Sequence, residues 1–273
     1  MRCMAESATA CSYCGKKRAN LRRCSICKQT WYCGAECQKA AWKGHKATCQ
    51  PPLPPEEVIS KIGEAHSSED WRGVLKWKGR MEELLAIMAH ARNDFVCEFV
   101  LAAFQRAHSK LAILDRGHSI EVVKLGERRI ELLGKLQRFR DQGDEMHTIG
   151  AIFLRDHNFK DAIRYFQKAR DVGAAHGFFS IEGKACTGLG GVAIHEGRHE
   201  EGLELLRNAL VAFGLEDDEE SELSAMNYLI DALFTTDGFE EVDTLLPRFR
   251  EAATASSRRR GGFLCHEELS CFF

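Results

Sequence analysis

Proline is scarce and unevenly placed in this chain of 273 residues. It occurs five times, and four of the five stand close together at Pro51, Pro52, Pro54 and Pro55. After that run only Pro247 interrupts the sequence, and strand-like alternation between turn pairs is missing as well. Proline disrupts helices, and alternation is the mark of half-buried strands. Both absences therefore predict that the chain beyond the proline run is helical.

Long apolar stretches are also missing. No run approaches the roughly 18 apolar residues that a membrane-spanning helix needs, and residues 1–10 are too short and mixed for a secretory leader. We therefore expect an intracellular protein with no membrane partner, in the cytoplasm or the nucleus. Cysteines scattered without pattern fit such a reducing compartment. They are Cys3, Cys97, Cys186, Cys265 and Cys271.

Signatures of catalysis are absent too. The sequence holds no phosphate-binding loop, nucleophile elbow or dinucleotide fingerprint, and its eleven histidines show no helical pairing with a glutamate suited to catalysis. A glycine-rich stretch, residues 188–191, falls inside a repeated helical segment, where we expect glycine to serve close helix packing. These absences predict that the chain is not an enzyme.

Cysteine, in contrast, is plentiful near the N-terminus. Seven of the twelve cysteines and one histidine follow the spacing C-x2-C-x9-C-x2-C-x5-C-x3-C-x7-H-x3-C over residues 11–49. A C-x2-C pair presents two sulfurs from one turn, and ligands four apart share a helix face. Eight ligands complete two tetrahedral zinc sites and leave no position for water, so we predict structural zinc, two ions per chain. The ligands are Cys11, Cys14, Cys24, Cys27, Cys33, Cys37, His45 and Cys49.

Residues 11–49 resemble the MYND-type zinc finger. The likeness rests on Tyr32-Cys33, on Glu36-Cys37-Gln38, on Trp42, and on the closing His45-Lys46-x2-Cys49. It implies a short ββα fold with interleaved zinc sites. One site would hold Cys11, Cys14, Cys33 and Cys37, and the other Cys24, Cys27, His45 and Cys49. Spacing alone allows a sequential pairing equally well. About 40 residues are too few to fold by apolar burial alone, so folding should require the metal.

The same resemblance implies a peptide-binding surface at Gln38 and Trp42. Corepressor fingers of this type bind proline-rich peptides of the form Pro-x-Leu-x-Pro, and Trp42 would offer a flat apolar face to proline rings. Trp42 as the small core of the finger is an equal alternative. Residues 51–55 spell the same peptide pattern. Only one residue separates them from Cys49, however, which favours an extended linker, residues 50–56, between two domains.

Charge is distributed unevenly. Residues 1–50 hold ten of the 38 lysines and arginines but two of the 40 acidic residues, which the net charge of −2 conceals. A basic zinc module suggests an alternative function, a nucleic-acid-associated transcriptional regulator. Its basic residues cluster in a loop rather than on a base-reading helix, so we favour protein or peptide partners. They are Lys16, Lys17, Arg18, Arg22 and Arg23.

An internal repeat of about 40 residues organises the helical region, residues 57–255. Gly150, Gly190 and Ile230 are equivalent, as are Phe166, Leu206 and Leu246. The units resemble tetratricopeptide repeats and imply an all-α superhelix, with the clearest units at 140–175, 180–215 and 220–254. Their helices are joined by turns at 156–158, 196–198 and 236–238. A generic helical bundle is the alternative. A match near residues 95–136 is weaker, and residues 256–273 read as a flexible tail.

The first helices of these units should line a concave groove that holds a second partner. The expected lining is mixed and nearly uncharged, and it lacks the Lys and Asn clamp that chaperone-binding relatives use. It consists of His147, Ala151, Leu154, Thr187, Gly191, Asn227 and Asp231. We therefore predict a mostly α protein. Its function would be that of a zinc-binding adaptor, in which the finger binds a peptide and the helical repeats bind a second partner.

Overall fold

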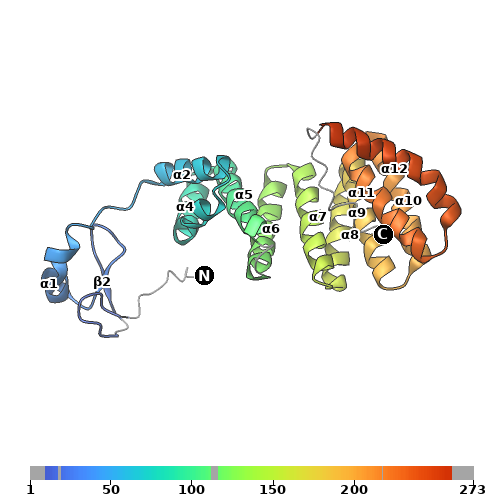
Figure 1. The fold of residues 1–273 in the computed structure, drawn as a ribbon. Helices are drawn as coiled ribbons and strands as arrows, with labels where there is room; N and C mark the ends of the chain where they lie inside the picture. Colours follow the sequence, from blue (N-terminus) through green and yellow to red (C-terminus); the bar gives the residue numbers. More distant parts are fainter. Residues whose placement is uncertain (1–9, 18–19, 112–115, 217, 260–273) are drawn as a thin grey trace. The chain divides into compact units, whose positions relative to one another are not determined.

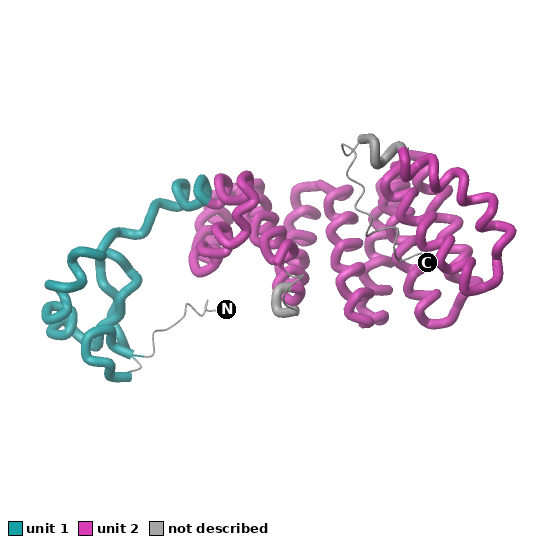
Figure 2. The backbone as a smooth tube through the Cα atoms, viewed as in Figure 1, with its two compact units in different colours: residues 1–61 teal, residues 62–273 magenta. Residues whose placement is uncertain are grey.

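The computed structural model describes residues 10–17, 20–111, 116–216 and 218–259. They fall into two compact units, residues 1–61 and 62–273, coloured separately in Figure 2. In the parts of the chain that the structure describes, every helix is too short or too polar to cross a bilayer.

The N-terminal unit contains two short strands and a helix. Strand β1 (Arg22–Arg23) pairs antiparallel with β2 (Trp31–Tyr32), with Arg23 opposite Trp31. Helix α1 (Ala35–His45) follows. This arrangement confirms the expected ββα finger. Residues 50–54 adopt no regular structure, and helix α2 (Pro55–Ser67) begins at the last proline of the run. Proline suits the first turn of a helix because no intrahelical partner awaits its missing N–H.

The remaining helices follow one another along the chain (Figure 1). The first four are α3 (Trp71–Leu75), α4 (Lys78–His90), α5 (Asp94–Leu111) and α6 (Arg116–Lys135). Three further pairs are α7 (Phe139–Arg155) with α8 (Phe159–His176), α9 (Phe179–His195) with α10 (His199–Glu216), and α11 (Glu219–Thr235) with α12 (Phe239–Arg259). The first residues of equivalent helices in successive pairs are separated by one length of the sequence repeat. This spacing confirms the repeat and excludes an accidental periodicity.

The turns between these helices recur at an even interval, half that of the repeat. Gln137, His157, Gly177, Gly197 and Asp237 all adopt positive φ. Each is followed by a backbone N–H that bonds the carbonyl five residues earlier, as Asn158 does to Phe153. This bond is the mark of a Schellman motif, which ends a helix with a left-handed residue. The turns expected at 156–158, 196–198 and 236–238 are therefore helix caps of one kind.

Close packing of α7, α8 and α9 centres on one aromatic ring. Phe166 of α8 is fully buried. A Cβ atom added at Gly150 of α7 would lie 2.6 Å from this ring, and one at Gly188 of α9 would lie 2.5 Å from it. Both glycines are therefore required for packing, which confirms the role expected for Gly188.

The last helix continues through the one proline of the helical region. The sequence predicted an interruption at Pro247, but α12 runs from Phe239 to Arg259. Pro247 is exposed, while Leu245, Leu246 and Phe249 pack against the core formed by α10 and α11. This apolar anchoring on both sides of the proline compensates for the lost hydrogen bond. Residues 260–273, most of the expected tail, lie outside the described residues.

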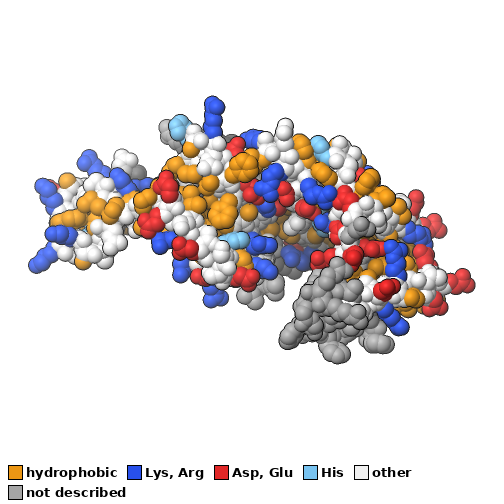
Figure 3. All heavy atoms as spheres, turned by 90° about the horizontal axis from the view of Figure 1, so that it is seen from above, with side chains coloured by type: hydrophobic (Ala, Val, Ile, Leu, Met, Phe, Trp, Pro, Cys, Tyr) orange, Lys and Arg blue, Asp and Glu red, His pale blue; other side chains and the backbone are white. Residues whose placement is uncertain are grey.

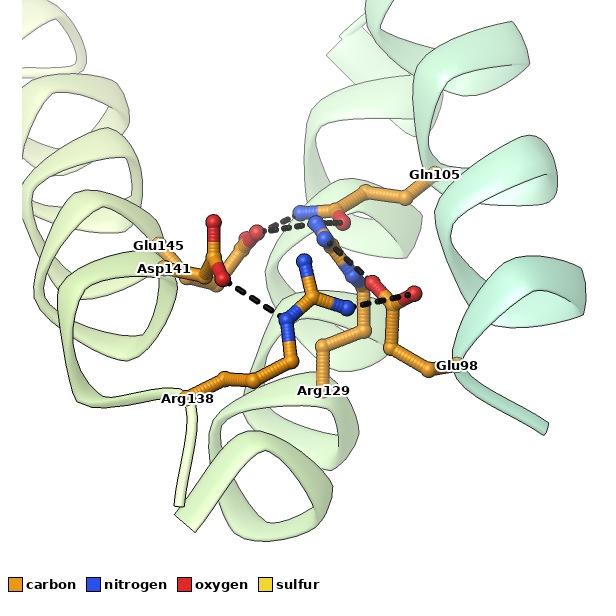
Figure 4. A network of polar contacts seen from close by, with 6 residues as sticks. All are labelled: Glu98, Gln105, Arg129, Arg138, Asp141 and Glu145. Atoms are coloured by element: carbon orange, nitrogen blue, oxygen red, sulfur yellow. Dashed lines mark hydrogen bonds and ion pairs between the residues drawn. The ribbon is translucent and has the colours of Figure 1, made fainter. Parts of the chain in front are cut away.

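A polar network joins α5 and α6 to α7 (Figure 4). Arg129 of α6 donates to Glu98 at 2.8 Å and to Gln105 at 2.7 Å, and it also contacts Glu145 of α7. Arg138 donates to Glu98 at 3.3 Å and to Asp141 at 2.7 Å. Burial raises the pKa of the Glu145 carboxyl although Arg129 and Gln105 contact it. Removing a single partner would leave a buried charge uncompensated, so the network holds these helices in one arrangement.

Candidate metal centre and partner surfaces

Four cysteines from three parts of the finger form the first cluster. Cys11 and Cys14 come from the turn before β1, Cys33 follows β2, and Cys37 lies in the first turns of α1. Their sulfur atoms all lie within 4.8 Å of one another. The Sγ atoms of Cys14 and Cys33 are 3.6 Å apart, and those of Cys33 and Cys37 are 3.2 Å apart.

The second cluster combines three cysteines with a histidine. Cys24 and Cys27 flank the turn between the strands, His45 ends α1, and Cys49 follows it. Their ligand atoms also lie within 4.8 Å of one another. The Sγ atoms of Cys24 and Cys49 are 3.6 Å apart, and Cys27 Sγ lies 3.5 Å from His45 Nε2. The structure thus groups the eight side chains in the interleaved manner, one of the two that spacing left open.

These distances suit tetrahedral zinc. Two sulfurs bound to one zinc at about 2.3 Å lie about 3.8 Å apart in a regular tetrahedron. The observed separations of 3.2–3.6 Å are close to that edge. Each cluster offers four ligand atoms of the types that structural zinc prefers. Two zinc ions therefore fit the finger.

The thiol pKa values show why a cation is needed. A backbone N–H donated by Cys14 lowers the pKa of Cys11 to about 6. The hydrogen bond shared with the Cys33 thiol raises the pKa of Cys37 to about 12. In the other cluster, burial raises the pKa of Cys49 to about 11. Thiolates this close repel one another, so some keep their protons until a divalent ion supplies the opposite charge.

Tyr32 fills the small core of the finger. Its side chain is 1% exposed and packs among Cys11, Cys24 and Cys27. Its ring meets the His45 ring edge to face, with centroids 6.1 Å apart. The buried core of the finger thus consists of one tyrosine and three ligand cysteines, with Leu21 and Ala41 packed against it. This is too little apolar surface for stability without metal.

Trp42 occupies a different position from Tyr32. It is half-buried on α1, and its ring lies edge to face with that of His45, with centroids 5.9 Å apart. Gln38, one turn earlier, is also half-buried. Cys37 and His45 lie on the helix stripe that faces the clusters, and residues four apart share a face. Gln38 and Trp42 therefore form the adjacent stripe, which reaches solvent.

The basic side chains of the finger are exposed. Blue side chains surround the finger in Figure 3. Among the described finger residues, 10–17 and 20–50, no ion pair neutralises them. Arg23 makes a cation–π contact, with its guanidinium 4.3 Å from the ring centre of Trp31. The exposed cations include Lys16, Lys17, Arg22, Arg23, Lys28, Lys39, Lys43 and Lys46.

A pocket of about 260 Å³ lies where α7, α9 and α11 meet. It is lined by Asp144, His147, Thr148, Lys184, Thr187, Phe213, Ser221 and Ser224. His147 and Thr187 line this pocket, as the sequence predicted. The sequence analysis did not predict the ion pair between Lys184 Nζ and Asp144 Oδ1, which are 2.8 Å apart. Both charges stand three residues before an expected lining residue, so helical periodicity could have found them. The lining is therefore not uncharged.

The apolar end of the groove lies further along the same helices. A Cβ atom built on Gly191 of α9 would lie 3.6 Å from Leu154 of α7 and 4.0 Å from Tyr228 of α11. Side chains of three successive first helices thus meet on one face, as a tetratricopeptide-like stack requires. Tyr228 stays partly exposed there.

His147 should make the stability of the helical unit depend on pH. Burial, aided by the nearby charge of Lys184, lowers the pKa of His147 to about 4. In the unfolded chain histidine titrates near pH 6.5, so stability present above that pH is lost as the pH falls toward 4. We expect His147→Gln to remove this part of the acid sensitivity, about 3 kcal/mol between pH 7 and pH 4. Urea unfolding of both proteins at the two pH values measures it, and equal losses would contradict the assignment.

Comparison with known families and structures agrees with both units. The family model of the MYND finger matches residues 11–49, so the zinc-binding finger is a MYND finger. N-lysine methyltransferase SMYD2 of Homo sapiens is 44% identical over 46 residues, which cover 17% of this chain and 11% of that protein. The chain therefore spans about a tenth of the length of this relative, and the similarity is confined to the finger.

The helical unit resembles solved repeat proteins. A STAND protein with a tetratricopeptide repeat sensor from Pyrococcus horikoshii superposes with a TM-score of 0.58 and 15% identity, over 82% of this chain and 34% of that one. The tetratricopeptide-like repeats of a putative kinesin light chain of Podosopora anserina give 0.51 and 16%, over 74% and 96%. At such identities the likeness shows the fold alone, and it confirms an all-α stack of tetratricopeptide-like repeats. The two parts together support a protein-interaction module.

Proposed function

We propose that this protein is a zinc-dependent adaptor that holds a peptide on its finger and a second protein in its helical groove. The observation that supports the proposal is the presence of two separate units, one with the Gln38 and Trp42 stripe on α1 and one with a pocket lined by α7, α9 and α11. In the finger, Cys11, Cys14, Cys33 and Cys37 hold one zinc ion, and Cys24, Cys27, His45 and Cys49 hold the other. The ions keep α1 in place and present its outer stripe, residues 38 and 42.

The finger surface suits a proline-containing peptide. Trp42 offers part of a flat aromatic face, held edge-on by His45, and proline rings pack on such faces without losing rotamer freedom. Gln38 beside it carries both a donor and an acceptor for the peptide backbone. We take a peptide of the Pro-x-Leu-x-Pro type as the ligand class.

The helical groove suits a second partner because its two ends differ in chemistry. The Lys184–Asp144 pair and hydroxyl side chains occupy one end, and Leu154 and Tyr228 provide the other. Such mixed surfaces bind extended segments through hydrogen bonds at polar positions and burial at apolar ones. No catalytic role is proposed for either unit.

Trp42→Ala should weaken peptide binding and spare the metal. The side chain lies outside the Tyr32 core, so its loss should leave two zinc ions per chain while weakening a Pro-x-Leu-x-Pro peptide on the order of 30-fold or more, as for a buried aromatic anchor. Fluorescence polarisation with a labelled peptide and elemental analysis measure the two effects. Lys39→Ala, an exposed change on the same helix, is the matched control.

Two outcomes would contradict this part of the proposal. Loss of zinc together with binding would make Trp42 a structural residue. Unchanged peptide affinity with both ions retained would place the peptide surface elsewhere on the finger.

Nucleic-acid binding is the second candidate, because the exposed cations of the finger carry no ion-pair partner among its described residues. Binding to phosphates would weaken steeply with salt, whereas an apolar peptide contact would not. A titration of duplex DNA and of the peptide from low to high salt separates the two functions.

A further inference from the structure

An acidic side chain at the apolar end of the helical groove lacks a counter-charge. Asp231 of α11 is exposed, and its carboxylate makes no hydrogen bond or ion pair with any described side chain. Burial raises the pKa of this carboxyl, and no cation among the described residues offsets that effect. The other end of the groove differs, because Lys184 pairs there with Asp144. The charge of Asp231 therefore remains available to a ligand.

An exposed tyrosine lies one helical turn before this carboxylate. Tyr228 is 44% exposed. Side chains three residues apart on a helix share a face, with their Cβ atoms about 5–6 Å apart. The Cε1 atom of Tyr228 lies 4.0 Å from the position of a Cβ atom built on Gly191 of α9, so the ring reaches across the groove toward the neighbouring helix. A ring and a free carboxylate are thus adjacent on one face of α11.

Gly191 keeps the floor of the groove open beside this ring. A Cβ atom there would meet Leu154 and Tyr228 at ordinary contact distances, 3.6 and 4.0 Å. Internal packing therefore does not require glycine at this position, in contrast to Gly188, where a Cβ atom would overlap a ring. Glycine is also unfavourable inside a helix. Its effect at position 191 is to leave space next to Tyr228 that a ligand side chain can enter.

Arginines of this chain show how a ring and a carboxylate act together. The Cζ atom of Arg140 lies 4.8 Å from the ring centre of Phe178, and its Nη2 donates to Glu216 at 2.9 Å. The same combination is present in a second set of residues, Arg164, Tyr165 and Asp161. A planar guanidinium can stack on a ring while its N–H groups donate to a carboxylate, whereas a lysine ammonium offers a point charge.

Among the described residues, Tyr228 and Asp231 form such a pair without an arginine. We propose that they bind an arginine side chain of the second partner, with its guanidinium on the Tyr228 ring and its N–H groups donating to the Asp231 carboxylate. The aliphatic part of that side chain packs on the floor at Gly191. The inference rests on the proposed role of the helical groove and adds the chemistry of the ligand, an extended peptide segment that carries an arginine.

Peptide selection on the full chain loaded with zinc tests the proposal. The probe is a library of short random peptides, from which those that bind the parent chain more tightly than Gly191→Ala are kept. This variant adds a methyl group where the fold has room, so it should stay folded by circular dichroism while it obstructs the groove floor. We expect these peptides to be enriched in arginine. Replacement of the arginine by citrulline, its neutral isostere, should weaken binding on the order of tenfold in fluorescence polarisation.

Variants of the pair assign the arginine to its site. Asp231→Asn should remove most of the difference between the arginine and citrulline peptides, because the carboxylate no longer attracts the cation. Tyr228→Leu should reduce the difference, and Tyr228→Phe should retain it, since the ring is kept. Asp243→Asn is the matched control. It removes an exposed carboxylate of α12 and should bind both peptides as the parent chain does.

The outcomes separate this inference from the proposed function. Peptides that depend on Gly191 but not on arginine, or an arginine preference that Asp231→Asn leaves unchanged, would overturn the inference while the groove keeps its proposed role. Selection of no peptide that depends on Gly191 would overturn both. Binding that appears only after the arginines of residues 258–260 are changed to alanine would assign the pair to the chain's own arginines and would overturn the inference as well.

Discussion

Chelation of zinc is expected to unfold the finger and leave the helical unit folded. Structural zinc contributes about 10–16 kcal/mol per site in small fingers, and the fully buried part of this finger consists of Tyr32 and ligand cysteines. Among the described residues, the helical unit contributes no ligand to either cluster. Added chelator should therefore abolish the dispersed amide signals of residues 11–49 in NMR spectra, while helical circular dichroism stays nearly constant.

Substitution of single cysteines sharpens this expectation. Cys33→Ser should lower the zinc content and disorder the finger, because Cys33 Sγ lies within 3.6 Å of two other ligand sulfurs. Cys265→Ser, at a cysteine that does not belong to the ligand spacing of residues 11–49, is the control and should retain two ions per chain by elemental analysis. One zinc ion in the parent chain, or a chelator that melts both units together, would contradict the assignment.

Phe166→Ala is expected to cause a large loss of stability in the helical unit. The ring is fully buried between α7 and α9, and truncation of a buried phenylalanine to alanine costs about 3–5 kcal/mol. The ring contacts helices of two successive pairs. We therefore expect both pairs to unfold at a lower urea concentration, in one transition. Urea denaturation followed by circular dichroism measures the change in the free energy of unfolding.

A double-mutant cycle with Gly188 tests the cause of that loss. Gly188→Ala should destabilise the parent chain by about 1–3 kcal/mol, because its methyl group would overlap the Phe166 ring. In the Phe166→Ala background the same change fills space and favours the helix, so it should stabilise. Gly214→Ala, where no atom lies within 4 Å, should stabilise both backgrounds equally. Equal effects of Gly188→Ala in both backgrounds would show that the ring and the glycine do not compete for space.

The finger and the repeat could be predicted from sequence because their signals are local and periodic. Ligand spacing determines which side chains can reach a metal, and a regular repeat places whole helix pairs without any knowledge of packing. The grouping of Cys11 with Cys33, and of Cys24 with Cys49, depends on how the strands fold back. Spacing alone therefore left that grouping open, and the family resemblance supplied it.

Other features depend on contacts between residues distant in sequence. Glu145 occupies an ordinary helical position, and its burial beside Arg129 and Gln105 arises only when α5, α6 and α7 meet. The helix through Pro247 was mispredicted for the same reason, since apolar contacts with α11 outweigh a local propensity.

The left-handed caps that recur along the helical unit make it modular in length. The caps at Gly197 and at Asp237 occupy equivalent positions in successive repeats, and both use a residue with positive φ. Excision or duplication of one helix pair between equivalent caps would leave every remaining joint with the turn that it already has. The scaffold can thus evolve in steps of one helix pair, and its reach can change while the finger at its end stays the same.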